Sequence, residues 1–156
     1  MLRLGLVLAL VVAIVDQAVK AVLLDVMAAQ GGPVAVTGFF NLVTVWNRGV
    51  SFGLFNRGEG VSPWLFIALA AGIVAALVWW LAKARDRWLA LLLGLVIGGA
   101  AGNMVDRLRF GAVADFFDLH LAGWHWPAFN VADAAISVGV ALLLLDALLR
   151  RGGRRR

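Results

Sequence analysis

Cysteine and tyrosine are both absent from this chain of 156 residues. The absence of cysteine excludes disulfide bonds, thiolate metal sites and a cysteine nucleophile. The sequence also lacks the Gly-Lys-Ser or Gly-Lys-Thr motif that cradles phosphates in nucleotide sites. Charge is scarce, at 15% of residues, and long stretches carry none. These absences leave few residue types that can carry chemistry.

Apolar side chains dominate instead, at 63% of residues, and the mean hydropathy is +0.93. Soluble domains are nearer half apolar, so this composition indicates a membrane protein. The length allows one domain and little else. We therefore predict a single integral membrane domain over residues 1–150, with a basic cytoplasmic tail at residues 151–156.

Four apolar segments are long enough to cross a bilayer, whose core of about 30 Å requires about 20 helical residues. They are Leu4–Leu24, Gly60–Ala82, Trp88–Val105 and Phe129–Leu149. The first follows Arg3 as the apolar part of a signal peptide would. However, Asp16 and Lys20 interrupt it and no clear cleavage site follows, so we expect a retained helix.

The basic residues flank these apolar segments, and they account for the net charge of +5. Nine of the fourteen lysines and arginines lie in the two termini and in one short loop: Arg3, Lys83, Arg85, Arg87, Arg150, Arg151, Arg154, Arg155 and Arg156. The positive-inside rule places these parts in the cytoplasm. The distribution favours membrane topology and anionic-lipid contact over nucleic-acid binding, so we expect no nucleic-acid partner.

Two longer connections, residues 25–62 and 106–128, are then expected to face outward. In the first, Gly31-Gly32-Pro33 and Gly38 indicate turns, and a further turn is expected at Asn56–Gly60. Between these turns lie β-branched and aromatic residues that favour short strands: Val34, Val36, Phe39, Phe40, Val43, Val45 and Trp46. We predict an all-α membrane protein with four transmembrane helices and a small extracytoplasmic β-sheet and loop region.

Four acidic residues lie inside or at the rims of the apolar segments: Asp16, Asp106, Asp115 and Asp133. An ionisable group at membrane depth is costly, so it usually faces the protein interior and carries function. Three of them gather at the outer rim, whereas Asp16 is expected to lie deeper, with Lys20. Asp16 and Lys20 share one helix face at i and i+4. A self-neutralising pair and a role in shaping a site both remain open for them.

Two further motifs combine glycine with asparagine. Asn47, Gly49 and Gly53 indicate tight backbone geometry, which would serve either to hold a substrate backbone or to make an ordinary turn. Later, Gly94, Gly98 and Gly102 recur every four residues and leave one helix face nearly bare for a close helix contact. Packing explains those glycines but not the polar residues that follow them: Asn103, Asp106 and Arg107. Arg107 is expected to pair with Asp106 or with another carboxylate.

Asp115 and Asp133 are each surrounded by apolar residues, and Asn130 precedes Asp133 by three residues. If the two carboxylates meet, their charges repel and the pair shares one proton. One can then take a proton from water while the other donates one, as in aspartic proteases. The residues alone do not show that they meet.

Other catalytic hypotheses are weaker. His120 and His125, with Asp118 nearby, fit no helical metal-ligand spacing and are expected in an interfacial loop, so we predict no metal site. Three serines lack an obvious base: Ser51, Ser62 and Ser137. Two non-enzymatic classes also remain. Buried carboxylates suit a transporter or proton channel, and the bare glycine face suits a membrane scaffold.

Taken in order, four motifs resemble the lipoprotein signal peptidases (signal peptidase II). The matching residues are Asp16-Gln17 with Lys20, then Asn47, Gly49 and Phe52, then Gly102-Asn103 with Asp106-Arg107, and finally Asp115-Phe116 with Phe129-Asn130 and Ala132-Asp133. Each motif is weak alone, but the ordered set covers nearly the whole chain and is specific. One departure is Arg48–Ser51, where relatives often carry smaller residues; it is expected to affect substrate contacts and not the chemistry.

The resemblance implies an aspartyl endopeptidase of the bacterial cytoplasmic (inner) membrane that needs no cofactor. Such enzymes remove the signal peptide from prolipoproteins, just before a cysteine that carries diacylglycerol. Carried over by position, Asp115 and Asp133 form the catalytic dyad. The supporting and substrate-binding residues would be Asp16, Lys20, Asn47, Gly49, Asn103, Asp106, Arg107 and Asn130. The resemblance also implies inhibition by globomycin and an active site on the outer side, and we expect a monomer.

Overall fold

The computed structural model describes residues 1–49 and 63–153. Within these ranges, four helices are long and apolar enough to cross a membrane, as predicted. They are α1 (Leu2–Gln30), α2 (Pro63–Lys83), α3 (Arg87–Phe110) and α4 (Val131–Gly153). The chain is therefore a multi-pass membrane protein. The predicted turn at Asn56–Gly60, the motif residues Phe52 and Gly53, and two of the serines, Ser51 and Ser62, lie outside the described residues.

Helices α1 and α3 extend beyond the predicted apolar segments, and local caps determine where they end. At the start of α3, the Asp86 side chain accepts a hydrogen bond from the Trp88 backbone N–H at 3.1 Å. At its end, Gly111 adopts a left-handed φ of 72° and its N–H donates to Arg107 O. Gly31 ends α1 in the same conformation. Glycine reaches this conformation at little cost, so both glycines make good helix stops.

Small residues let α1 and α3 approach each other closely. A Cβ atom added at Gly94 would lie 2.6 Å from Gly5 O, and one added at Gly98 would lie 2.5 Å from Ala9 O. Both contacts are far too short for a real side chain. The close helix contact predicted from the glycine spacing is thus confirmed, with α1 as the partner.

Two apolar clusters are buried within the described residues. One lies among α1, α2 and α3 and contains Ala9, Leu81, Ala90, Leu93 and Ile97. The other lies where the end of α1 meets the sheet and contains Met27, Ala114 and Phe116. The second cluster fixes the sheet against the membrane-spanning helices, which matters for the position of the polar residues beside it.

The sheet has four antiparallel strands in the order β1-β2-β3-β4. They are β1 (Val34–Thr37), β2 (Phe40–Asn47), β3 (Val113–Leu121) and β4 (Trp124–His125). The strands predicted from the first outer connection, and the turn at Gly38, are confirmed. The second connection was expected only as a loop, but it supplies β3 and β4. The sequence alone did not indicate β3, because β3 is stabilised by pairing with β2. These two strands are far apart in the chain.

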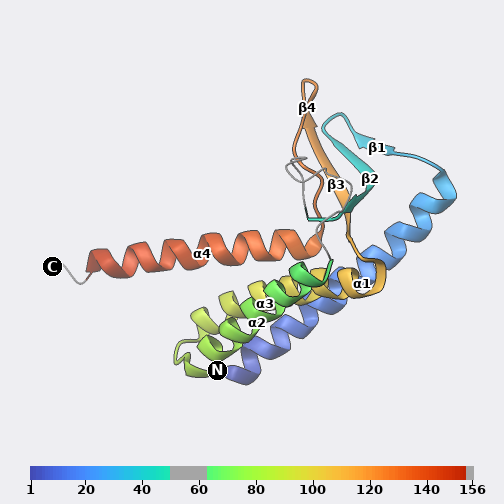
Figure 1. Ribbon diagram of the computed structural model, residues 1–156. Coiled ribbons are helices and arrows are strands. Elements are labelled where there is room, and N and C mark those ends of the chain that lie inside the picture. The colour runs from blue at the N-terminus through green and yellow to red at the C-terminus, as the bar shows by residue number, and fades with distance from the viewer. Residues whose placement is uncertain (50–62, 154–156) are drawn as a thin grey trace.

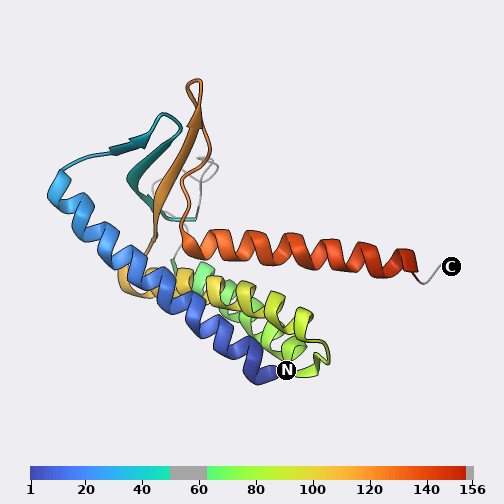
Figure 2. The ribbon, with the colours of Figure 1, turned by 180° about the vertical axis from the view of Figure 1, so that it is seen from behind.

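The sheet lies at one end of the helices, and both termini lie toward the other end (Figure 1). Seen from behind, the connection between α2 and α3 also lies at the end remote from the sheet (Figure 2). The strands of both outer connections therefore lie on one side, opposite the start of α1 and the short connection between α2 and α3. α4 starts beside the sheet and continues to Gly153, into the segment predicted as a tail. A separate role for residues 151–156 stays a prediction.

Candidate active site

Asp115 and Asp133 lie on different elements and are joined by one asparagine. Asp115 is on β3, and Asp133 is in the first turn of α4. The Asn130 side-chain amide donates to Asp115 Oδ1 at 2.7 Å, and its backbone N–H donates to Asp133 Oδ2 at 3.2 Å. Both carboxylates are thus bonded to a single residue, so the fold brings together the two aspartates that sequence could not join.

Local sequence explains how Asn130 reaches this position. Asn130 Oδ1 accepts from the Asp133 backbone N–H at 2.9 Å, while Asp133 accepts from the Asn130 N–H. This reciprocal pair is a capping box, which satisfies backbone donors at a helix start. Just before it, Phe129 O accepts from the backbone N–H groups of Phe116 and Phe117 on β3. The start of α4 is therefore docked directly beside Asp115.

Asn103 connects this pair to the helix interior. Its side-chain amide donates to Asp133 Oδ1 at 2.7 Å. Its Oδ1 atom accepts from Asn130 Nδ2 at 3.2 Å and from Lys20 Nζ at 3.1 Å. Asn103 is buried, so each of these bonds satisfies a polar group that water does not reach. One amide thus orients Asp133 and also contacts a buried cation.

Asp16 and Asp106 each hold the backbone beside one of the two aspartates. Asp16 Oδ1 accepts from the backbone N–H of Ala132, which precedes Asp133, at 2.9 Å. Asp106 Oδ2 accepts from the backbone N–H of Ala114, which precedes Asp115, at 3.1 Å. Both carboxylates are fully buried. They therefore fix the positions of α4 and β3 relative to α1 and α3.

Lys20 neutralises both of these buried carboxylates. Its Nζ atom lies 2.8 Å from Asp16 Oδ2 and 2.7 Å from Asp106 Oδ2. The ion pair between Asp16 and Lys20 is present, and the two residues also belong to the polar network around Asp115 and Asp133, so the two alternatives left open for them both describe this structure. The four-carbon stem of lysine carries the ammonium group across to α3, where it also meets Asn103. The network is continuous from α1 to Asp133.

Asn47 and Gly49 reach the same site from β2. Asn47 Nδ2 donates to Asp115 Oδ2 at 3.2 Å, and Asn47 Oδ1 accepts from the Gly49 N–H at 2.9 Å. Gly49 has a φ of 89°, and an added Cβ there would lie 2.7 Å from the Phe66 ring. Only glycine fits such a position without strain. The tight geometry predicted for this motif therefore exists, and it aims Asn47 at Asp115.

Arg107 was expected to pair with a carboxylate, and Lys20 takes that place beside Asp106. The Arg107 guanidinium instead donates to Asn103 O at 3.4 Å and lies 5.6 Å from the centre of the Phe66 ring. Arg107 projects from α3 toward Phe66 of α2. Its position beside Phe66 and Asn103 places a cation next to the polar network without a direct ion pair to Asp106.

A cavity of about 480 Å³ opens beside Asp133, and we call it the Asp133 groove. Its lining residues are mostly apolar and comprise Asn47, Leu119, Trp126, Pro127, Ala128, Phe129, Asp133, Ala134, Ser137 and Val138. Asp133 is partly exposed, whereas Asp115 is only 1% exposed. The two carboxyl groups therefore differ in environment. Asp133 lines the groove, whereas Asp115 is buried.

That difference affects protonation. Burial raises the pKa of the Asp115 carboxyl to about 6, and the negative charge of Asp133 acts in the same direction. The amides of Asn47 and Asn130 favour the ionised form and partly oppose this rise. Asp115 therefore holds a proton up to a pH of about 6, while a second carboxylate stands close by. Such an unequal pair is suited to acid–base chemistry.

The two histidines do not form a metal site in the part of the chain that the structure describes, where no group of three potential ligands is close enough. They lie on paired strands and not in a loop: His120 faces His125 across β3 and β4, with ring centres 5.0 Å apart. His125 Nδ1 lies 2.8 Å from Asp118 Oδ1. The hydrogen bond from the Asn41 amide is the main cause that lowers the pKa of Asp118, and the hydrogen bond with His125 lowers it further. This cluster stabilises the sheet.

Gln17 is a network residue that was not among the predicted site residues. Its side-chain amide donates to Asp106 Oδ1 at 2.7 Å and to Asp16 Oδ2 at 3.2 Å. Its place next to Asp16 in the first motif was the available signal. Its polar side chain satisfies the remaining oxygen of Asp106, so the buried carboxylate has a partner at each oxygen.

The chain matches a family model described as signal peptidase (SPase) II over residues 8–149. A lipoprotein signal peptidase of Methylobacterium sp. (strain 4-46) is 50% identical over 148 residues, which cover 93% of this chain and 88% of that protein. A lipoprotein signal peptidase of Burkholderia vietnamiensis (strain G4 / LMG 22486) is 45% identical over 149 residues, covering 95% and 89%.

Solved structures agree with these relatives. A bacterial membrane enzyme structure obtained by the in meso method at 2.3 Å resolution has a TM-score of 0.78 and 28% identity, covering 97% of this chain and 91% of that one. A second, at 1.9 Å resolution, has a TM-score of 0.76 and covers 92% of each chain. These matches decide between the peptidase and the two non-enzymatic classes that composition left open. The chain belongs to the signal peptidase II family and is an aspartic endopeptidase of that type.

Proposed function

We propose that this protein removes the signal peptide from diacylglyceryl-modified bacterial prolipoproteins, cutting just before the lipidated cysteine, with Asp115 and Asp133 as the catalytic dyad. The observation that carries the assignment is that one residue, Asn130, hydrogen-bonds both carboxylates beside an apolar groove. Family membership supports the reaction and its lipoprotein substrates. No cofactor is needed, because two carboxyl groups suffice for water activation.

In the proposed mechanism, Asp133 is ionised and takes a proton from a water molecule, whose oxygen attacks the scissile carbonyl carbon. Asp115 is protonated and hydrogen-bonds the carbonyl oxygen as negative charge develops on it. The intermediate then collapses, the peptide C–N bond breaks, and the leaving amine of the cysteine receives the proton that Asp133 took from the water, which returns Asp133 to its ionised form. The partly exposed Asp133 and the raised pKa of the Asp115 carboxyl support this division of roles.

The substrate is proposed to lie in the Asp133 groove. The diacylglyceryl group adjoins the scissile bond, so it must lie within a few ångströms of the dyad. Each CH₂ group taken from lipid into water costs about 0.8 kcal/mol, so the lipid chains must stay in apolar surroundings throughout. A groove with a carboxylate among residues such as Trp126, Phe129 and Val138 meets both requirements. We propose that globomycin-type cyclic peptides bind in the same groove.

The supporting residues are assigned by what they contact. Asn47, Asn103 and Asn130 orient the dyad carboxylates through their side-chain amides. Asp16 and Asp106 hold the backbone next to each dyad residue, and Lys20 neutralises both of them. Gly49 and Arg107 shape the side of the site next to Phe66. All of these residues come from one copy of the chain, so we propose that a monomer is active.

The proposed location is the cytoplasmic membrane, with both termini inside and the active site on the outer side. Arg3, Lys83, Arg85 and Arg87 lie at the end of the helices remote from the sheet, and the positive-inside rule places that end in the cytoplasm. Because the chain has no cysteine, single-cysteine variants report sidedness directly. A membrane-impermeant thiol reagent should label Gly38→Cys in intact cells and label Arg85→Cys only after lysis. The reverse pattern would reject this orientation.

The dyad is tested with a diacylglyceryl-modified precursor in a gel-shift assay, with and without globomycin. Asp115→Asn and Asp133→Asn should each lower cleavage by at least about 10²-fold, as expected for loss of a general acid or base. Asparagine keeps the shape of each side chain, so thermal unfolding should change little. Asp25→Asn is the matched control, because Asp25 is an exposed aspartate at the end of α1. Cleavage at the wild-type rate by either dyad variant would reject the assignment.

A further inference from the structure

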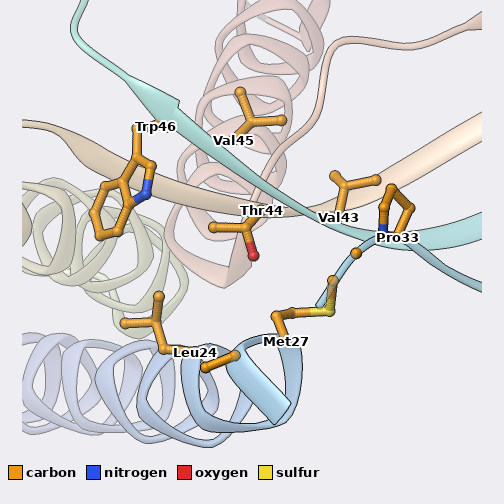
Figure 3. Close-up of a pocket in the computed structure, with 9 residues that line it drawn as sticks. Leu24, Met27, Pro33, Val43, Thr44, Val45 and Trp46 are labelled. Carbon is orange, nitrogen blue, oxygen red and sulfur yellow. The ribbon is translucent and has the colours of Figure 1, made fainter. Parts of the chain in front are cut away.

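A second cavity, of about 560 Å³, lies between the last turns of α1 and strand β2. Its lining residues are Leu24, Met27, Ala28, Gly32, Pro33, Val43, Thr44, Val45 and Trp46. In Figure 3, Thr44 and Trp46 lie on the side of β2 that faces Leu24 and Met27 of α1. No residue lines both this cavity and the Asp133 groove. We call it the α1–β2 cavity.

The lining determines what the cavity can hold. The only polar side-chain groups in the lining are the hydroxyl of Thr44 and the indole N–H of Trp46. A peptide segment would bring backbone N–H and C=O groups that need partners, and burying them unpaired is unfavourable. A charged headgroup would likewise find no ionic partner among the lining residues. A hydrocarbon chain has none of these requirements, so it is the chemistry that fits.

The cavity is continuous with the membrane-facing surface of α1. That helix has 29 residues, whereas about 20 residues cross a bilayer core of about 30 Å, so its last turns lie near the outer headgroups. Ala21, Leu24 and Ala28 follow one another at i, i+3 and i+7, so they form one apolar stripe along α1, and Ala21 is exposed where lipid tails would contact it. The last two of them, Leu24 and Ala28, form part of the cavity wall. Apolar surface therefore extends from the bilayer into the cavity.

We propose that the α1–β2 cavity binds one acyl chain of a membrane phospholipid. The chain leaves the bilayer along the face of α1 that carries Ala21, Leu24 and Ala28, and it ends beneath β2. Its contact with Trp46 and Met27 anchors the sheet to the membrane surface, because Met27 also packs against Ala114 and Phe116 of the sheet. The site is separate from the groove assigned to the substrate.

The experiment uses the full chain in phosphatidylcholine vesicles that contain a phosphatidylcholine with a photoreactive diazirine at the end of one acyl chain. After illumination, the labelled residues are mapped by mass spectrometry. Labels should appear on Met27 and on residues 43–46. The end of an acyl chain otherwise stays near the bilayer centre, so labels at this outer level require that the chain enters the cavity.

Two neighbouring substitutions make the test specific. Ala28→Phe fills the cavity and should reduce this labelling to background. Ala29→Phe makes the same change on the next residue, which is exposed and does not line the cavity, and should leave labelling intact. Both variants should unfold at the same temperature and should still cleave a lipidated precursor, which separates this proposal from the peptidase assignment.

Three outcomes would overturn the proposal. Equal labelling of Ala28→Phe and Ala29→Phe would show that the probe reaches these residues without entering the cavity. Displacement of the label by a diacylglyceryl-modified precursor would make the cavity part of the substrate site. A label that joins two copies of the chain would show that protein, and not lipid, covers this surface.

Discussion

The side-chain amide of Asn130 donates to Asp115 Oδ1 at 2.7 Å, across the boundary between the sheet and the helices. Asn130 is also the first residue of the capping box that starts α4. The same side chain therefore caps the start of α4 and orients a carboxylate on β3. Stability of the helix and geometry of the dyad are coupled at this position.

Replacing Asn130 by serine separates these two tasks. Serine is a good N-cap, so α4 should remain stable, but it has no amide that can reach Asp115. We expect kcat to fall by about 10²-fold, because misplacement of a catalytic group by about 1 Å has an effect of that size. The measurement is precursor cleavage together with thermal unfolding. Asn130→Ala, which loses both tasks, should also unfold at a lower temperature; wild-type kcat in the serine variant would contradict the role of the amide.

The protonation of Asp115 should be visible in the infrared spectrum. Burial and the charge of Asp133 raise the pKa of Asp115 to about 6, so its protonated C=O band should disappear as the pH rises through about 6. In Asp133→Asn the neighbouring negative charge is gone, so the pKa of Asp115 should fall and the band should disappear at lower pH. Asp115→Asn identifies the band by removing it. A transition that stays in place in Asp133→Asn would show that the two carboxyl groups are not coupled.

Lys20 should be essential for stability. Lys20→Met leaves the buried carboxylates of Asp16 and Asp106 without their cation, and breaking a buried ion pair in this way costs about 3–5 kcal/mol. Denaturant unfolding in detergent micelles measures the loss. A further Asp106→Asn change should recover part of it, because one uncompensated charge is removed. Lys83→Met is the control, since Lys83 is exposed; an equal loss in both variants would contradict the network.

Close packing of α1 on α3 predicts opposite effects for two glycines. Gly98→Ala places a methyl group 2.5 Å from Ala9 O, so the helices must separate, and overpacking of this kind costs about 1–3 kcal/mol. Gly72 lies within α2 with nothing within 4 Å of an added Cβ, so Gly72→Ala should stabilise by roughly 0.5–1 kcal/mol. Unfolding measurements on both variants give the comparison. Similar shifts of the same sign would mean that helix propensity, and not contact, decides.

The spans, the strands of the first connection and the polar motifs were predictable because each depends on neighbours in sequence. The i and i+4 spacing of Asp16 and Lys20 already indicated their ion pair. The contacts of Lys20 with Asp106 and of Asn41 with Asp118 were not predictable, because they join segments far apart in the chain. For the same reason, the spacing could not show that Asp16 also bonds the backbone at Ala132.

By itself the sequence determined that the chain crosses a membrane four times and carries its acidic residues in apolar surroundings. Charge-free segments of sufficient length and the placement of basic residues are properties of composition. Only the tertiary structure decided that Asp115 on β3 and Asp133 on α4 share Asn130, and that β3 exists at all. The pairing of β3 with β2, and the bonds that Phe129 and Asn130 make with β3 just before α4, depend on packing between distant segments, and such packing has no local signature.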